Sequence, residues 1–450
     1  MDTENVHDSL PATSSFSNAP FDILEEIFMA CPTPLNELDG SLKPKTYFEC
    51  FTESLPAWAL SGVCQHWRES ALSMPALWST ALIDRSAIRS GRRREDFLVF
   101  LSLLLERSKN VPLTIHLDCD GDNEDVLNIL SPHISRARVL YIRFHENPEL
   151  GLRNLLSGSR FPFLYSLSAS IYPGGQFSPI SPAFAHAPFL ERLCIETYSA
   201  RAQWIDSIGM PWSQICYFKS GGLFTEITSF YKNLLRMPNL IHLDLDNIRF
   251  SSDHFPSEPL PYTRLEYLTC IRLSHTASCE AWDHLNNLEL PALTEMDLRG
   301  VPLSAVKSLL ERSKCASQLN ALTLWGTDSG EIGRETIKEI LFMTPNLVSL
   351  NLQTLSGSLH KGEDFIQLFT PNPDAERDGL PSGVLLPKLT TLQIEPGKSG
   401  WFRINDFIDG LVSREVLPTV KRVTLPGGWG TTVYEISGVQ EVKETYYPEQ

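Results

Sequence analysis

The side chains best suited to chemistry in this sequence are His242, Asp244 and Asp297. An imidazole and carboxylates are the groups that most often hold a metal ion or move a proton. His242 and Asp244 are two residues apart, so on an extended strand their side chains would point to the same side. Asp297 follows in a later segment of similar pattern. The three would suit a divalent cation or an acid–base pair, whereas the simpler interpretation makes them solvent-facing residues of a sheet.

Other signatures of catalysis are missing from the sequence. The chain has no H-E-x-x-H, no P-loop, no G-x-S-x-G and no glycine pattern of dinucleotide binding. The segment GGWG at 427–430 lacks the lysine that a phosphate loop needs. We interpret His66, on an expected helix, as a surface residue. We therefore predict that the protein is not an enzyme and has no catalytic residue, no metal site and no cofactor.

The element that would position these side chains is a strand within MPNLIHLDLDN, residues 237–247. Leu240, Leu243 and Leu245 have the spacing L-x-x-L-x-L, and the last part alternates apolar with polar residues, as a half-buried strand does. One strand of this kind cannot bury its apolar edge alone. We therefore expect similar units on both sides of it.

The same triplet recurs along the chain at a nearly constant step. Its first residue falls at Pro112, Ala137, Leu164, Leu190, Ile215, Leu240, Leu265, Leu293, Leu319 and Leu347, and again at Leu389 and Val420. From residue 112 to residue 347 the steps are 25, 27, 26, 25, 25, 25, 28, 26 and 28 residues. These steps lie within the range of about 20–29 residues that is typical of leucine-rich repeats. In the unit after Leu240, the triplet is assigned to Leu265, Leu268 and Cys270.

Helical patterns lie between most of these strands. Examples are EDVLNILSPH, TEITSFYKNLLRM, LSAVKSLLERS and RETIKEILFM. A strand and a helix that alternate in this way stack into a curved parallel sheet with helices on its outer side. The predicted fold class is therefore α/β, a leucine-rich-repeat solenoid, preceded by a small all-α segment.

The side chains that flank the strand leucines would project from the concave side of such a sheet. The candidates for partner binding are Glu196, His242, Asp244, Asp246, Tyr267, Glu295, Asp297, Arg299, Trp325 and Asn351. They form an acidic stripe beside two exposed aromatics, and Tyr and Trp are common anchors of protein interfaces. The stripe favours a protein partner of basic character. The alternative is that its charge only keeps the protein soluble.

The overall composition describes a folded protein of the cell interior. Of the 450 residues, 42% are hydrophobic and 20% are charged. The net charge of −16 argues against nucleic acid or an anionic membrane as a partner. The nine cysteines form no C-x-x-C pair, and the first residues lack the pattern of a signal peptide. We expect a cytoplasmic or nuclear protein, or one that is both.

The N-terminal part carries three motif pieces in a fixed order. The first is P-x-D-I-L-x-x-I-F, from Pro20 to Phe28; the second is V-C-x-x-W-R, from Val63 to Arg68; the third is S-x-P-x-L-W, from Ser73 to Trp78. We expect one amphipathic helix at the first piece, and a second in LPAWALSGVCQHWRESAL. The order of the pieces resembles an F-box, in the fungal form that has an insertion after its first helix. The resemblance covers residues 18–83.

This resemblance implies a substrate-recognition adaptor of a cullin-type (SCF) ubiquitin ligase. Its helices would dock a Skp-type adaptor, while the solenoid would hold an unknown substrate protein. The residues expected to bind the adaptor are Pro20, Ile23, Leu24, Ile27, Phe28, Leu60, Val63, Cys64 and Trp67. The protein itself would be a non-catalytic subunit of the ligase.

The alternative is a leucine-rich-repeat binding scaffold unconnected to a ubiquitin ligase, whose N-terminal helices only cap the solenoid. Exposure of Ile23, Leu24, Ile27 and Val63 to solvent would favour docking, and burial of these residues against the first repeats would favour a cap. A third possibility, a hidden hydrolase or transferase, would need His, Asp or Cys side chains that converge, and the sequence suggests none.

The domain organisation follows from these patterns. We predict a disordered N-terminus, an F-box-like helical domain, a connecting helix, the solenoid with one insertion loop, and a C-terminal cap or tail, at residues 1–17, 18–83, 84–111, 112–425 with the loop at 371–383, and 426–450 respectively.

Overall fold

The structure is a computed structural model, and it describes most of the repeat strands and the helices near the N-terminus. The residues it describes are 19–31, 56–85, 88, 91–146, 148–156, 158–171, 182–197, 209–221, 227–248, 261–275, 285–325, 331–353, 369, 386–395, 419–427, 430–437 and 441–448. The predictions for residues 1–17 and for the loop 371–383 lie outside these ranges.

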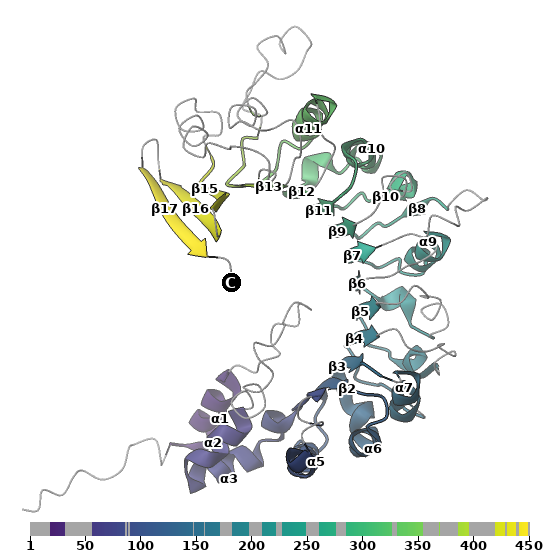
Figure 1. Cartoon of the computed structure of the whole chain (residues 1–450), viewed down its shortest axis with the longest axis vertical. Helices are drawn as coiled ribbons and strands as arrows, with labels where there is room; N and C mark the ends of the chain where they lie inside the picture. Colours follow the sequence, from purple (N-terminus) through teal and green to yellow (C-terminus); the bar gives the residue numbers. More distant parts are fainter. Residues whose placement is uncertain are drawn as a thin grey trace, which may run out of the picture. The chain divides into compact units, whose positions relative to one another are not determined.

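The chain divides into two compact units. The first comprises residues 1–190 and 207–211, and the second comprises 191–206 and 212–450. Each unit is built from parallel strands, which carry the apolar triplets, and from helices that connect them (Figure 1).

The first unit begins with three short helices, α1 (Phe21–Ala30), α2 (Pro56–Val63) and α3 (Gln65–Ser73), and a 3-10 turn, η2 (Pro75–Trp78). They enclose a small core of buried apolar side chains: Leu24, Phe28, Leu60, Ala71 and Met74. The buried indole of Trp78 donates a hydrogen bond from Nε1 to the carbonyl of Ala71, 2.8 Å away. The turn after α3 is thereby fixed against the helices.

The prediction of one continuous second helix is wrong, because the helix breaks at Cys64. The backbone of Cys64 is extended, with φ −158° and ψ 174°, and its Sγ accepts a hydrogen bond from the amide of Trp67. Cys64 therefore caps the N-terminus of α3 and separates it from α2. Val63 and Trp67 consequently lie on different helices.

The strands of the first unit follow directly. They are β1 (Thr80–Ile83), β2 (Leu113–Cys119), β3 (Ala137–Phe144) and β4 (Ser166–Ile171), all paired in parallel in this order. Helices α5 (Gly91–Arg107), α6 (Glu124–Leu130) and α7 (Pro148–Leu156) connect them, with the 3-10 turns η3 (Ser131–Arg136) and η4 (Pro182–His186). Because β1 pairs with β2, the last residues of the F-box-like segment already form a strand of the sheet.

The second unit contains its own series of parallel strands. Their order is β5 (Arg192–Thr197), β6 (Tyr217–Gly221), β7 (His242–Ile248), β9 (Cys270–His275), β11 (Glu295–Arg299), β12 (Ala321–Trp325), β13 (Ser349–Gln353), β14 (Thr391–Glu395) and β15 (Arg422–Gly427). The connecting helices are α9 (Ile227–Leu235), α10 (Leu303–Ser313) and α11 (Glu331–Met343), with the 3-10 turns η5 (Trp212–Gln214) and η8 (Ala316–Gln318). In Figure 1 the strands of this unit line the inner side of the curve and these helices lie outside them. Two short strands, β8 (Thr263–Arg264) and β10 (Leu288–Glu289), pair separately in parallel.

The strand register confirms the predicted triplets with two exceptions. In the first predicted repeat Leu113, not Pro112, pairs with Ala137 and is buried, while Pro112 is exposed. The other exception is the unit that contains β9. Leu243 pairs with Phe218 on one side and with Ile271 on the other, and Ile271 pairs in turn with Met296. The triplet of that unit is therefore Leu268, Ile271 and Leu273, and the assignment to Leu265, Leu268 and Cys270 was three residues early. The strands of the repeats then share one pattern, in which the triplet residues face the core and the residues between them face outward.

The sheet ends in a reversal of strand direction. β16 (Gly430–Ser437) pairs antiparallel with β15, and β17 (Glu441–Pro448) pairs antiparallel with β16. Of the two possibilities for residues 426–450, a cap and a tail, the structure has strands that extend the sheet beyond the last repeat.

Candidate binding surface

One face of the sheet in the second unit points away from the core that the triplets form. Each strand presents three side-chain positions on this face, and the register aligns these positions across the sheet. From β5 to β14 the middle positions are Cys194, Lys219, Asp244, Arg272, Asp297, Thr323, Asn351 and Gln393. These positions lie on hydrogen-bonded backbone, so their spacing is set by the sheet. We call this face the outward face of the second unit.

The middle row alternates in charge from β6 to β11. Lys219 Nζ lies 3.5 Å from an oxygen of Asp244, and both side chains are largely buried. Burial alone would lower the pKa of Lys219, but Asp244 outweighs it and the pKa is raised. On the next strand Arg272 lies between Asp244 and Asp297, and these carboxylates help to raise its pKa against the effect of burial. The expected acidic stripe is thus neutralised by cations that lie within it.

A stacked row of side chains crosses β5, β6 and β7 beside this ladder. The guanidinium of Arg192 lies 4.2 Å from the centre of the Tyr217 ring, and that ring stacks on His242 with centroids 4.6 Å apart. Burial, and then the charge of Arg272, lower the pKa of His242, so its imidazole is neutral near pH 7. Its Nε2 is buried and has no hydrogen-bond partner among the described residues.

The imagined acid–base site does not form around His242. Asp244 pairs with Lys219, and Asp297 lies 3.3 Å from Arg299. The strand that carries Arg272 lies between the two strands that carry these carboxylates. The neighbouring thiol of Cys270 is no nucleophile, because burial raises its pKa to about 12. In the part of the chain that the structure describes, no group of three or more His, Cys, Asp or Glu side chains could hold a metal ion.

The outward face changes character at β12. On β12 and β13 its positions carry no charge, being Ala321, Thr323, Trp325, Ser349, Asn351 and Gln353. Trp325 is half-buried, and the guanidinium of Arg299 lies over its ring, 4.9 Å from the centre. Oδ1 of Asn351 is buried and accepts no hydrogen bond from any described residue.

Nearly all of the predicted binding residues lie on this face. Glu196, His242, Asp244, Asp246, Glu295, Asp297, Arg299, Trp325 and Asn351 occupy outward strand positions. Tyr267 does not: it lies in the turn before β9, with 59% of its side chain exposed. The prediction for Tyr267 was wrong because of the register error, which also hid Arg272. The spacing of Leu268, Ile271 and Leu273 fits the triplet as well as the predicted frame does, so the sequence alone did not reveal Arg272.

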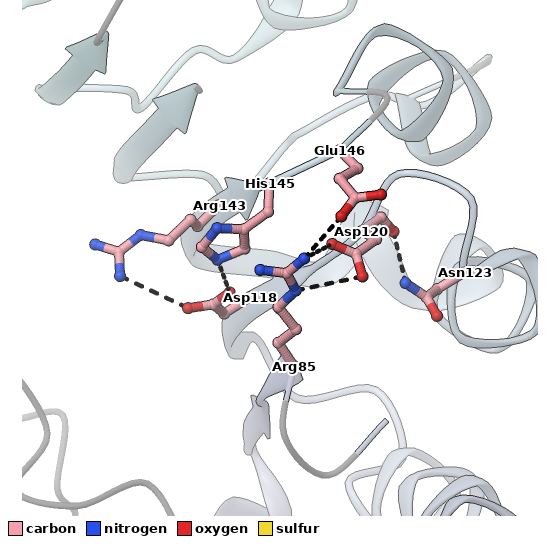
Figure 2. A network of polar contacts seen from close by, with 7 residues as sticks. All are labelled: Arg85, Asp118, Asp120, Asn123, Arg143, His145 and Glu146. Atoms are coloured by element: carbon pink, nitrogen blue, oxygen red, sulfur yellow. Dashed lines mark hydrogen bonds and ion pairs between the residues drawn. The ribbon is translucent and has the colours of Figure 1, made fainter. Parts of the chain in front are cut away.

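The first unit carries a separate polar network that the sequence reasoning missed (Figure 2). It joins the residues that follow β1, β2 and β3. Arg85 lies 2.9 Å from Asp120 and 3.0 Å from Glu146, and Asn123 Nδ2 donates to the carbonyl of Asp120 at 2.9 Å. These contacts join the segments that follow β1, β2 and β3.

The second half of the network is centred on Asp118, which is buried. Nε2 of His145 lies 2.7 Å from Oδ1 of Asp118, and Arg143 lies 3.6 Å from its other oxygen. The charged groups pair with one another, so we interpret the network as structural. Its signal in the sequence is that acidic residues follow one strand and basic residues follow the next.

The residues expected to dock an adaptor divide into two sets. Leu24, Phe28 and Leu60 are buried in the core of the three helices, so the expectation that they contact a partner was wrong. Ile27, Cys64 and Trp67 are half-buried. Pro20, Ile23 and Val63 are exposed, with 52% of Ile23 and 59% of Val63 accessible to solvent.

Comparison with known proteins assigns the chain to no family. No protein-family model matches the chain, and no curated protein matches it. Among solved structures, an internalin of Listeria monocytogenes has 18% identity and a TM-score of 0.30 over 57% of this chain and 72% of that chain. A protein of Bacteroides fragilis has 13% identity and a TM-score of 0.35 over 64% and 74%. A chain of the TLR13–ssRNA13 complex has 14% identity and a TM-score of 0.32 over 70% of this chain and 46% of that chain.

The assignment of the fold rests on the chain's own geometry. Strands recur at the predicted step, pair in parallel with matching registers, and bury the central triplet residue of each repeat. None of the helices in the described ranges has the length and apolar composition that a membrane span requires. The chain folds as a leucine-rich-repeat solenoid with additional helices at its N-terminal side.

Proposed function

We propose that the protein is a substrate-recognition adaptor of a cullin-type (SCF) ubiquitin ligase, active in the cytoplasm or the nucleus. The observation that carries the proposal is that the F-box-like segment folds as a small helical unit and leaves apolar side chains in solvent. Ile23 on α1 and Val63 on α2 are 52% and 59% exposed. Exposed apolar residues on otherwise packed helices are typical of a surface that binds another protein.

The burial pattern separates folding from docking within this segment. Leu24 and Phe28 face the inner core, and Phe28 packs edge-on against Trp67 with ring centroids 5.2 Å apart. Ile23 and Ile27 are one helical turn apart and therefore lie on a common side of α1. That side and the exposed end of α2 are the surface proposed for the Skp-type adaptor.

The solenoid supplies the second half of the proposed function. A substrate protein held on the outward face would be kept near the enzyme that transfers ubiquitin. Tethering of this kind raises the effective concentration of the target lysines without any bond chemistry by this chain.

The second candidate function is a binding scaffold in which the N-terminal helices only cap the solenoid. The packing of Trp58 favours it: its ring stacks on Phe100 of α5 at 4.5 Å, and Arg107 lies over the rings of both Trp58 and Trp78. The helices thus cover the start of the repeats through α2 and η2. This contact leaves Ile23 and Val63 exposed, so it is compatible with docking as well.

The test is co-purification of the full chain with a Skp-type adaptor. We expect wild type to bind, and the double variant Ile23→Asp, Val63→Asp to lose at least tenfold in affinity. Each large aliphatic side chain is worth roughly 1.5–3 kcal/mol when fully buried. Because both residues are exposed in the isolated chain, the variant should remain folded by circular dichroism.

The matched control is Val99→Asp on α5, a valine that is 62% exposed and lies outside the F-box-like segment. It should bind the adaptor as wild type does. A well-folded wild type that binds no Skp-type adaptor would remove the ligase role and leave the scaffold.

A further inference from the structure

We infer that the solenoid binds its partner chiefly through the outward positions of β12, β13 and β14. The part of the partner that binds there is an uncharged, extended peptide segment. The inference rests on the proposed function in one respect only, namely that the solenoid is a protein-binding surface. It differs from the expectation of a basic partner, which depended on an acidic stripe.

The first argument is the distribution of charge along the outward face. From β5 to β11 every strand places at least one charged side chain outward. On β5, β7 and β11 two or three outward positions are charged or imidazole side chains, whereas β6 and β9 contribute one each, Lys219 and Arg272, to the alternating row. On β12 and β13, and at Thr391 and Gln393 of β14, the outward positions are uncharged. The two regions meet at Arg299 and Trp325.

Desolvation decides which region can form the core of an interface. Lys219 and Asp244 already satisfy each other, and a partner that covered them would remove their remaining water. Burying a charged pair costs free energy that its attraction need not return. Threonine, asparagine and glutamine cost much less to bury, provided that they gain hydrogen bonds. Interface cores are depleted in charge for this reason, with charged residues at the rim.

The second argument is a buried acceptor that has no donor. Oδ1 of Asn351, in the middle of this region, accepts no hydrogen bond from the residues that the structure describes. An unsatisfied buried polar atom is costly, on the order of 1–3 kcal/mol. A peptide N–H supplied by a partner, after a small rotation of the amide, would satisfy it.

Trp325 supplies the apolar anchor beside this acceptor. It occupies the end of β12, one strand from Asn351, and its ring is held by Arg299, which in turn contacts Asp297 at 3.3 Å. A side chain that is held in place before binding loses little conformational entropy on binding. Tryptophan is also among the residues that most often dominate interface energies.

The dimensions of the region suit an extended segment. Neighbouring strands lie about 4.8 Å apart, so β12 to β14 span about 10 Å, and an extended peptide advances about 3.3 Å per residue. Three to four residues of the partner would therefore cross these strands. One of them would donate to Asn351, and an apolar neighbour would pack on Trp325.

The experiment selects peptides from a phage-displayed random library on the full chain. Enriched peptides are synthesised and titrated by fluorescence anisotropy. We expect sequences without charge in their central residues, and we expect Trp325→Ala and Asn351→Leu each to weaken their binding at least tenfold. The matched controls are Asp246→Asn and Glu295→Gln, exposed positions of the charged region, which should change the affinity less than threefold.

Two results would overturn the inference. One is a set of Lys- and Arg-rich peptides whose binding is lost in Asp246→Asn or Glu295→Gln and kept in Asn351→Leu. The other is a library that yields no peptide dependent on Trp325 or Asn351. Circular dichroism and co-purification with the Skp-type adaptor check that both variants are folded. A failure of adaptor binding in wild type would count against the ligase role alone.

Discussion

At the scale of single residues, His116 and Tyr141 form a stacked pair on neighbouring strands of the first unit. Their rings are almost parallel, with an interplanar angle of 3° and centroids 4.2 Å apart. Burial lowers the pKa of His116 to about 4, against the opposing effect of Asp118 and with the help of Arg143. The imidazole is therefore neutral in the folded protein at pH values where a free histidine would be protonated.

This shift makes the first unit sensitive to mild acid. Below an unfolded pKa of about 6.5, the unfolded chain binds a proton at His116 that the folded chain does not bind. Stability is therefore highest above that value and falls as the pH drops toward 4. From pH 7 to pH 5, His116 should cost the folded state up to about 2 kcal/mol of unfolding free energy.

The measurement compares urea unfolding of wild type and His116→Phe at pH 7 and at pH 5. Phenylalanine keeps the stack on Tyr141 but cannot be protonated. Between pH 7 and pH 5 the variant should lose less unfolding free energy than wild type. The difference should be most of the cost of about 2 kcal/mol that is assigned to His116. Equal losses in the two proteins would contradict the assignment to His116.

At the scale of elements, the packing of α7 against the end of β3 depends on Gly151, a position with no room for a larger side chain. A Cβ built on Gly151 would lie 2.8 Å from the Phe144 ring and 2.9 Å from the Cα of Gly121. The helix thus packs directly on the end of the strand and on the backbone of the neighbouring repeat. In α2, by contrast, a Cβ built on Gly62 meets nothing within 4 Å.

These two glycines predict opposite outcomes for the same substitution. Gly151→Ala should destabilise the protein by about 1–3 kcal/mol, because overpacking against backbone cannot be relieved by a rotamer change. Gly62→Ala should leave stability unchanged or raise it by about 0.5 kcal/mol, since alanine favours the helix. Thermal unfolding of both variants decides the matter, and a loss of stability in Gly62→Ala would show that free space is a poor guide here.

Elements are also where the sequence and the structure can be compared most directly. The repeat strands were predictable because the triplets must be buried in every unit, and a period is visible without knowledge of contacts. The register of β9 was not, because Leu265, Leu268, Ile271 and Leu273 are all buried and support two frames three residues apart. Only pairing with β7 and β11 distinguishes these frames.

The break at Cys64 and the polar network around Asp118 were unpredictable for other reasons. A thiol is an unusual helix cap, so the sequence around Cys64 predicts one continuous amphipathic helix. The network joins residues up to 61 positions apart, such as Arg85 and Glu146. Its partners become neighbours only when three strands have paired.

At the scale of the whole molecule, a solenoid distributes its stability along the chain. Each repeat contacts mainly its neighbours, so a local defect should affect nearby strands first. Leu298 on β11 is fully buried between strands of this kind. It is a suitable place to test the range over which a cavity is felt.

Leu298→Ala should cost about 2–5 kcal/mol, from lost burial and from the cavity that remains. We expect hydrogen exchange, measured by mass spectrometry, to accelerate in β9, β11 and β12, and to stay unchanged in β2 and β3. Leu235→Ala, at a leucine that is 50% exposed, is the control and should alter exchange little. Uniform acceleration along the chain would show that the solenoid unfolds as one cooperative block.

The antiparallel pairing of β15, β16 and β17 has a consequence for how such a protein can change length. A duplicated repeat must insert a strand that is parallel to both of its neighbours. No such position exists beyond β15, where the chain has already turned back. Gains and losses of repeats are therefore expected within the parallel region, so a related chain could lengthen there while β16 and β17 keep their pairing against the last parallel strand.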